Sequence, residues 1–121
     1  MFKRIGLVLL IGVVLLAACG GGGGAPAPAE APAGNAENGK TVFNGAGACS
    51  GCHSVEPGQV LVGPSLAGVG ADGAAELHES IVEPDAKITE GFTAGVMPKD
   101  YGEKLSDEQL NDLVAYLLTL K

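Results

Sequence analysis

Apolar residues at the carboxyl end of the chain repeat with the period of an α-helix. The repeating positions are Leu110, Leu113, Val114, Leu117 and Leu120. Ser106 and Gln109 have the spacing of a capping box at the start of this stretch, and Leu105 precedes the cap, where it can form a hydrophobic staple with Leu110. We therefore predict a helix over residues 107–120.

Two further helices are predicted from shorter patterns. Residues 36–44 follow Asn35, which is a good amino-terminal cap. Residues 73–82 end just before Pro84, and the residue that precedes a proline avoids helical geometry. Gly39 lies inside the first of these helices, where glycine is less favourable than alanine by about 1 kcal/mol. We interpret Gly39 as a point of close approach by another element.

The segments between these helices are rich in glycine and proline. They contain no alternating run long enough to predict a strand. We therefore predict an all-α fold of three or more helices joined by long loops. Loops of that length in a small domain usually wrap around something.

The first 18 residues resemble an export signal. Met1–Arg4 is basic, and Ile5–Ala18 is uncharged but shorter than the about 20 apolar residues that a spanning helix needs. Residues 16–19, Leu-Ala-Ala-Cys, then resemble the end of a bacterial lipoprotein signal, which implies cleavage after residue 18 and acyl chains on Cys19. The alternatives are an ordinary signal peptide cut near Ala18 and an uncleaved anchor.

Residues 19–34 are predicted to be a tether. Cys19 is followed by five glycines and then by alanine and proline, with no larger apolar residue to bury. Fully extended, such a segment reaches roughly 45–50 Å. Lipid on Cys19 is expected to hold the chain at the outer, periplasmic face of the bacterial cytoplasmic membrane. Residues 35–121 then form the folded domain.

The charge of the chain and its low aromatic content restrict the classes of partner and of core that we expect. The chain has 14 acidic and 7 basic residues, for a formal charge of −7, and removal of residues 1–18 would take away Lys3 and Arg4. Such an acidic chain repels phosphate backbones, so nucleic acid is not an expected partner. Residues 35–121 contain few aromatic side chains, and a domain this small is marginal on its own core. Another source of buried apolar mass is therefore expected.

The run Cys49–His53 (CSGCH) is a C-x-x-C-H sequence, the attachment signature of haem c. On one turn, its two thiols can reach the two vinyl groups of haem, and the adjacent imidazole then lies beneath the iron. A thioredoxin-like redox pair or disulfide would belong at the start of a βαβ helix, and no parallel strands are predicted. A structural zinc site needs four ligands, and only His78 and Cys19 remain outside the run. We therefore predict one haem c attached through Cys49 and Cys52.

Met97 is the candidate for the second axial ligand of the iron. It is the only methionine that remains once residues 1–18 are removed, and Pro98 would stiffen the loop that presents its sulfur. Packing in a core is the commoner role of methionine. His78 is the rival ligand, but it lies among charged residues on the predicted helix 73–82 and is interpreted as exposed to solvent.

Residues 35–121 resemble class I monohaem cytochromes c. The matching features are Gly39 and Phe43, the CSGCH run, Gly63–Leu66 (GPSL), Met97–Pro98, Leu105–Glu108 (LSDE) and Ala115–Leu117 (AYL). The resemblance implies the cytochrome c fold, with His53 and Met97 as axial ligands. It also implies that the carbonyl of Pro64 accepts a hydrogen bond from the other ring nitrogen of His53.

The same resemblance implies that Gly39 and Phe43 meet the last helix near Tyr116, in a nearly perpendicular crossing. It places Tyr101 just past the methionine loop, as a packing residue near a haem propionate. Two features depart from the family pattern. Residues 44–48 are two residues longer than in many relatives, and no tryptophan is available to bond a propionate.

Two strong axial ligands leave no site on the iron for a substrate, so we expect one-electron transfer rather than enzyme catalysis. The expected protein is a membrane-tethered carrier between a respiratory or photosynthetic donor complex and a terminal acceptor, with no small-molecule substrate. One alternative is a fixed subunit of a larger respiratory complex, such as a quinol-oxidising complex or an oxidase. Another is a haem enzyme or gas sensor with a labile sixth ligand. The excess of carboxylates fits either a basic partner surface or solubility alone.

Overall fold

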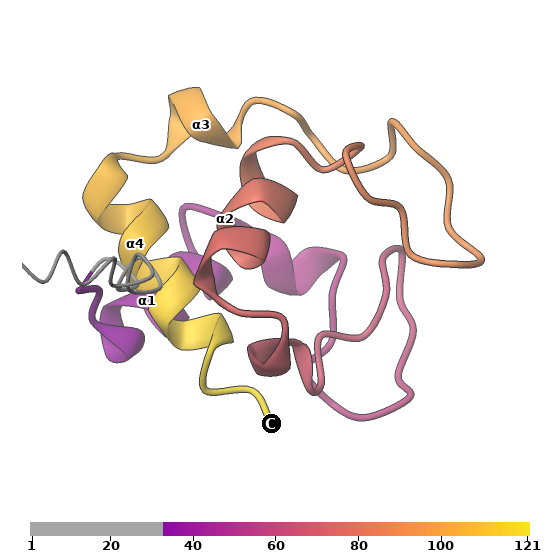
Figure 1. Ribbon diagram of the computed structural model, residues 1–121, viewed down its shortest axis with the longest axis horizontal. Coiled ribbons are helices and arrows are strands. Elements are labelled where there is room, and N and C mark those ends of the chain that lie inside the picture. Colours follow the sequence, from indigo (N-terminus) through magenta and orange to yellow (C-terminus); the bar gives the residue numbers. More distant parts are fainter. Residues whose placement is uncertain (1–32) are drawn as a thin grey trace, which may run out of the picture.

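Residues 33–121 are described by the computed structural model, and they form four helices connected by long loops (Figure 1). The helices are α1 (Ala36–Asn44), α2 (Ala74–Val82), α3 (Tyr101–Lys104) and α4 (Asp107–Leu117). Short 3-10 turns lie at Cys49–Gly51 and Val69–Ala71, and this part of the chain contains no strand. The prediction of an all-α fold is confirmed.

The predicted signal peptide, Cys19 and the tether up to residue 32 lie outside the described residues. Within residues 33–121, no helix has the length and apolar character needed to cross a membrane. Gly34, at the end of the predicted tether, lies against α4. A Cβ atom on Gly34 would come within 2.1 Å of the Asn111 carbonyl oxygen.

The predicted starts of α1 and α4 agree with the structure. The Asn35 side chain accepts hydrogen bonds from two backbone N–H groups in the first turn of α1. Ser106 and Gln109 form the expected capping box at the start of α4. Helix α2 begins one residue later than predicted, after Gly73, which has a φ of +90°.

Helix α4 ends three residues before its predicted end. Beyond Leu117 the backbone tightens, and the N–H groups of Thr119 and Leu120 donate to carbonyls three residues earlier. The Leu120 carbonyl then accepts a hydrogen bond of 2.9 Å from the Gly70 N–H. The last residues therefore turn to meet the 3-10 turn that precedes α2, a tertiary contact that the helical spacing of Leu117 and Leu120 cannot reveal.

Helices α1 and α4 pack with their backbones in direct contact. A Cβ atom on Gly39 would lie 1.9 Å from the Asp112 carbonyl oxygen and 2.8 Å from the Tyr116 Cβ, so only glycine fits there. Phe43, on the next turn of α1, packs edge-on against Tyr116 with ring centroids 5.5 Å apart. The close approach predicted at Gly39 is therefore confirmed.

A buried polar contact ties the start of α1 to α4. The backbone N–H of Asn35 donates to Oδ1 of Asp112 over 2.6 Å, and only 7% of Asp112 is exposed. The contact joins residues that are 77 positions apart in the sequence. It fixes where the chain enters the folded part.

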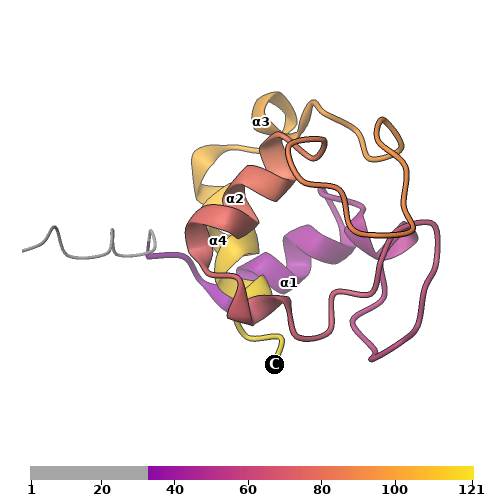
Figure 2. The same cartoon turned by 45° about the vertical axis from the view of Figure 1, so that its right-hand side comes forward.

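The buried core is formed by α1, α2, α4 and the residue before the α4 cap. Its members are Val42, Phe43, Leu77, Ile81, Leu105, Leu110, Leu113, Val114 and Leu117. The helices gather on one side of the molecule, and the loops that follow α1 and α2 extend on the other side (Figures 1 and 2). The apolar core therefore forms one wall of the space that these loops enclose.

Candidate functional site

A cavity of about 670 Å³ lies between the helices and the two long loops. The helices contribute apolar side chains to its wall, namely Phe43, Leu77, Ile81, Leu113 and Leu117. The residues predicted to contact haem also line it, namely Cys49, Cys52, His53, Pro64, Met97 and Tyr101. Residues from opposite ends of the domain are thus brought to one apolar space of the size usual for a small-molecule or cofactor site.

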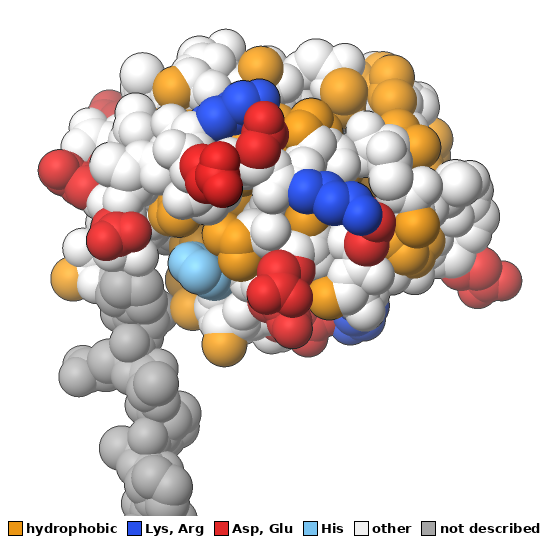
Figure 3. All heavy atoms as spheres, turned by 90° about the horizontal axis from the view of Figure 1, so that it is seen from above, with side chains coloured by type: hydrophobic (Ala, Val, Ile, Leu, Met, Phe, Trp, Pro, Cys, Tyr) orange, Lys and Arg blue, Asp and Glu red, His pale blue; other side chains and the backbone are white. Residues whose placement is uncertain are grey.

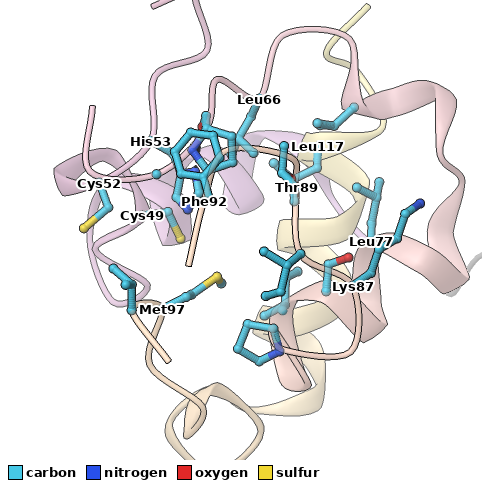
Figure 4. Close-up of a pocket in the computed structure, with 18 of the residues that line it drawn as sticks. Cys49, Cys52, His53, Leu66, Leu77, Lys87, Thr89, Phe92, Met97 and Leu117 are labelled. Atoms are coloured by element: carbon cyan, nitrogen blue, oxygen red, sulfur yellow. Dashed lines mark hydrogen bonds between the residues drawn. The ribbon is translucent and has the colours of Figure 1, made fainter. Parts of the chain in front are cut away.

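The C-x-x-C-H run begins on a single 3-10 turn, Cys49–Gly51. Ala48 precedes this turn with a φ of +48°, the one non-glycine residue with positive φ among those described. The carbonyl of Cys49 accepts hydrogen bonds from the N–H groups of both Cys52 and His53, at 3.1 and 2.9 Å. This turn holds the two cysteines and the histidine together at one edge of the cavity, as Figure 4 shows.

The two thiols are free but differ in their surroundings. Cys49 is partly buried and Cys52 is exposed. Burial is the main cause that raises the pKa of the Cys49 thiol, because desolvation disfavours the thiolate. Gly47 also approaches this sulfur closely, since a Cβ atom there would lie 2.9 Å from Cys49 Sγ.

The imidazole of His53 is oriented by the segment Gly63–Leu66. Its Nδ1 atom lies 2.8 Å from the carbonyl oxygen of Pro64, so the expected hydrogen bond is present and the imidazole donates it. A Cβ atom on Gly63 would come within 2.5 Å of His53 Cε1, so a side chain there would displace the ring. The Nε2 atom is the nitrogen left to face a metal.

Backbone hydrogen bonds fix this segment beside the histidine. Gly63 N–H donates to the Cys52 carbonyl, and Leu66 N–H donates to the Ser54 carbonyl, each over 2.8 Å. The buried Ser54 hydroxyl donates to Oε1 of Gln59 over 2.7 Å. Cys52 and Ser54, the residues before and after His53, therefore both have hydrogen-bonded backbone carbonyls.

Met97 reaches the same cavity from the loop between α2 and α3. Its side chain is partly buried, whereas its neighbours Val96 and Pro98 are exposed. In Figure 4 the Met97 side chain comes from a different part of the chain than Cys49 and His53 and lies beside the space that these residues border. His78, the rival ligand, is exposed on α2 and does not line this cavity.

Tyr101 begins α3 and connects it to the loop before the cysteines. Its hydroxyl donates to the Gly47 carbonyl over 2.9 Å, and its ring packs against the buried core. Burial is the largest cause that raises the pKa of this phenol, so it remains a neutral donor. The structure therefore gives the Tyr101 hydroxyl a protein partner while its ring borders the cavity.

Sequence reasoning missed three features of the site. The one-turn helix α3 was not predicted, since four residues produce no periodic pattern. The left-handed backbone of Ala48 has no signal in an alanine. The contacts of Asp85 with the loop that carries Met97 were also missed, because an aspartate after a proline resembles any surface residue.

The residues at this cavity fit a covalently attached haem. An apolar wall suits the porphyrin, and two free thiols on one turn suit thioether bonds. The His53 ring has one nitrogen bound to a carbonyl and the other left for iron. Because Gly63 has no side chain, the imidazole has space in its present position.

Comparison with known proteins gives the same assignment. A family model described as Cytochrome c matches residues 36–121, a range that includes all four helices and the whole cavity. No curated protein matches the chain. Cytochromes c bind a covalently attached haem c and transfer electrons with it. The chain therefore belongs to the cytochrome c family.

Proposed function

We propose that this cytochrome c is a class I, membrane-tethered one-electron carrier with His53 and Met97 as the axial ligands of its iron. The observation that carries the proposal is the shared cavity, which His53 and Met97 line from separate loops. When bound, the haem supplies an iron that changes oxidation state by one electron. The thioether of methionine favours the reduced iron relative to a second histidine or a thiolate.

The residues around the ligands are suited to a site that changes little between oxidation states. Pro64 holds the His53 ring in one orientation through its carbonyl. Apolar residues of α2 and α4 form one wall of the cavity. An apolar wall and a fixed imidazole reduce the rearrangement that a change of charge at the site requires.

Exposed apolar residues at the cavity support docking by a redox protein. Val62, Ile88 and Val96 all line the cavity, yet they are 58%, 40% and 57% exposed. Apolar contacts of this kind suit a small, transient interface, since electron-transfer encounters bury little surface. We propose that partners approach the haem over these residues.

Visible absorption spectra of the purified protein test the ligands. We expect a sulfur-to-iron charge-transfer band in the oxidised form, and no binding of carbon monoxide by the reduced form at neutral pH. The band is expected to disappear in Met97→Ala, whereas His78→Ala keeps it. A band that survives in Met97→Ala would overturn the ligand assignment. Carbon monoxide binding by the unaltered protein would favour the haem enzyme or gas sensor.

The tether is tested by fractionation of cells that express the full chain. We propose that Cys19 carries acyl chains and that residues 19–34 link it to the folded domain. Cys19→Ala is expected to move the haem absorbance from the membrane fraction to the soluble periplasmic fraction. Recovery of the unaltered protein in mild detergent only as a stoichiometric complex would favour a fixed subunit over a carrier.

A further inference from the structure

The loop between α2 and α3 has few internal restraints around Met97. Gly91 and Gly95 both have positive φ values, +87° and +80°, and most residues between Ala86 and Asp100 are exposed. The one backbone hydrogen bond within this stretch joins Phe92 N–H to the Thr89 carbonyl. A loop with so few contacts does not by itself hold a side chain at one position.

One carboxylate contacts this loop on both sides of Met97. Oδ1 of Asp85 accepts a hydrogen bond of 2.8 Å from the Gly95 N–H, two residues before the methionine. Oδ2 of the same side chain forms an ion pair with Lys99, two residues after it. Among the described residues, these are the hydrogen bonds and ion pairs that connect residues 93–99 to the rest of the chain.

Asp85 is itself attached to the rigid part of the molecule. It follows the buried Pro84, which lines the cavity two residues after the end of α2. The adjacent turn is closed by hydrogen bonds from Glu83 N–H to the Glu79 carbonyl and from Ala86 N–H to the Glu83 carbonyl. Helix α2 is anchored in the core through Leu77 and Ile81. The carboxylate thus links the loop to a fixed helix.

The charge of Asp85 suits this role. The Lys99 ammonium group is the main cause that lowers the pKa of this carboxyl below its usual range, and the Gly95 N–H lowers it further. Its side chain is 27% exposed, whereas that of Lys99 is 62% exposed. The contact with the Gly95 N–H is a charge-assisted hydrogen bond, which is stronger than one between neutral groups.

We infer that Asp85 is a positioning residue that holds the Met97 sulfur toward the haem iron by fixing the loop at Gly95 and Lys99. This inference rests on the proposed ligation by Met97. Asp85 acts through the backbone of the loop and not by contact with the iron. Its removal is expected to increase the fraction of molecules in which Met97 leaves the iron.

Imidazole binding to the oxidised holoprotein measures that fraction. Exogenous imidazole competes with Met97 for the iron, so its apparent affinity rises in proportion to the population with the methionine dissociated. We expect Asp85→Ala to raise this affinity about tenfold, because both contacts of the carboxylate are lost. Asp85→Asn keeps an acceptor for the Gly95 N–H, and Lys99→Leu removes the ion pair without adding a group that can bind iron. Each of these is expected to raise it about threefold.

Asp100→Ala is the matched control. Asp100 forms an exposed ion pair with Lys104 at 2.8 Å. It directly follows Lys99 but forms no hydrogen bond or ion pair with residues 93–99. Imidazole affinity in this variant is expected to equal that of the unaltered protein. A role of Asp85 in general stability alone would lower the thermal midpoint of its variants and leave imidazole affinity unchanged, and that result would overturn the inference.

The spectra separate failure of this inference from failure of the proposed ligation. If the charge-transfer band is absent from the unaltered protein or survives in Met97→Ala, the ligand assignment is wrong and the role of Asp85 falls with it. If the band depends on Met97 while the Asp85 and Lys99 variants bind imidazole like the control, only the positioning role is wrong. Should Asp85→Ala yield no holoprotein, Asp85→Asn and Lys99→Leu decide the question by the same comparison.

Discussion

Tyr101 connects the start of α3 to the loop before the cysteines, through a hydrogen bond between its hydroxyl and the Gly47 carbonyl. Tyr101→Phe would leave this partly buried carbonyl without its donor. We expect a loss of about 1 kcal/mol in the free energy of unfolding of the holoprotein, with an unchanged visible spectrum and reduction potential. Denaturant unfolding and a redox titration measure the two quantities.

The opposite result for Tyr101→Phe would assign the hydroxyl a different role. A shifted reduction potential with unchanged stability would mean that the hydroxyl faces the haem, as expected for a residue beside a propionate. The distance of 2.9 Å to the Gly47 oxygen favours the structural role.

Single residues differ in how far the sequence reveals their part in the site. Cys49, Cys52 and His53 were recognised because their spacing has a chemical meaning of its own. Asp85 was not, because its importance depends on which loop folds back onto it. Contacts between distant segments leave no local pattern to read.

At the scale of elements, the crossing of α1 and α4 depends on Gly39. Gly39→Ala would place a methyl group 1.9 Å from the Asp112 carbonyl oxygen, where backbone has to move. We expect a loss of about 3 kcal/mol or more in the free energy of unfolding, measured by urea titration of the holoprotein. Displacement of Tyr116 would also reduce its edge-on contact with Phe43.

Gly102→Ala is the control for Gly39→Ala. Gly102 lies in α3, and a Cβ atom there would meet only Val82 side-chain atoms, at 3.7 Å or more. This substitution is expected to be neutral or to stabilise by up to about 1 kcal/mol, since alanine favours helices over glycine. Equal effects of the two substitutions would show that crowding at the α1 and α4 contact does not explain Gly39.

Helix starts were predicted from the sequence more accurately than helix ends. Asn35 and Ser106 cap their helices with their own side chains, so the signal is local. The end of α4 is set by the hydrogen bond between Leu120 and Gly70, which are distant in the sequence. The single turn α3 was missed for another reason, because four residues produce no periodic pattern.

At the scale of the whole molecule, acidic residues dominate the surface. On the face shown in Figure 3, lysine side chains lie against acidic ones. Ion pairs occupy three of the lysines, with Lys87 bound to Glu76, Lys99 to Asp85 and Lys104 to Asp100. Because the chain has 14 acidic residues and only 7 basic ones, at least half of the acidic side chains have no basic residue to neutralise them.

This excess predicts how charged reagents exchange electrons with the protein. At low ionic strength, a small cationic oxidant is expected to react about tenfold faster than an anionic one of equal driving force, with the difference shrinking as salt is added. Stopped-flow kinetics over a range of ionic strength checks this. Rates without salt dependence would mean that the carboxylates serve solubility alone and do not steer partners.

The hydrogen bond between the Asn35 N–H and Asp112 has a mechanical consequence. Any pull transmitted along the chain from its amino-terminal side reaches the folded part at Gly34 and Asn35, which both lie against α4. The force passes first to Asp112 and then into the contact of α1 with α4, which is closed around Gly39. The loops that carry His53 and Met97 lie outside this path (Figures 1 and 2). A strained attachment would therefore load the contact of α1 with α4 before it reaches the loops that carry His53 and Met97.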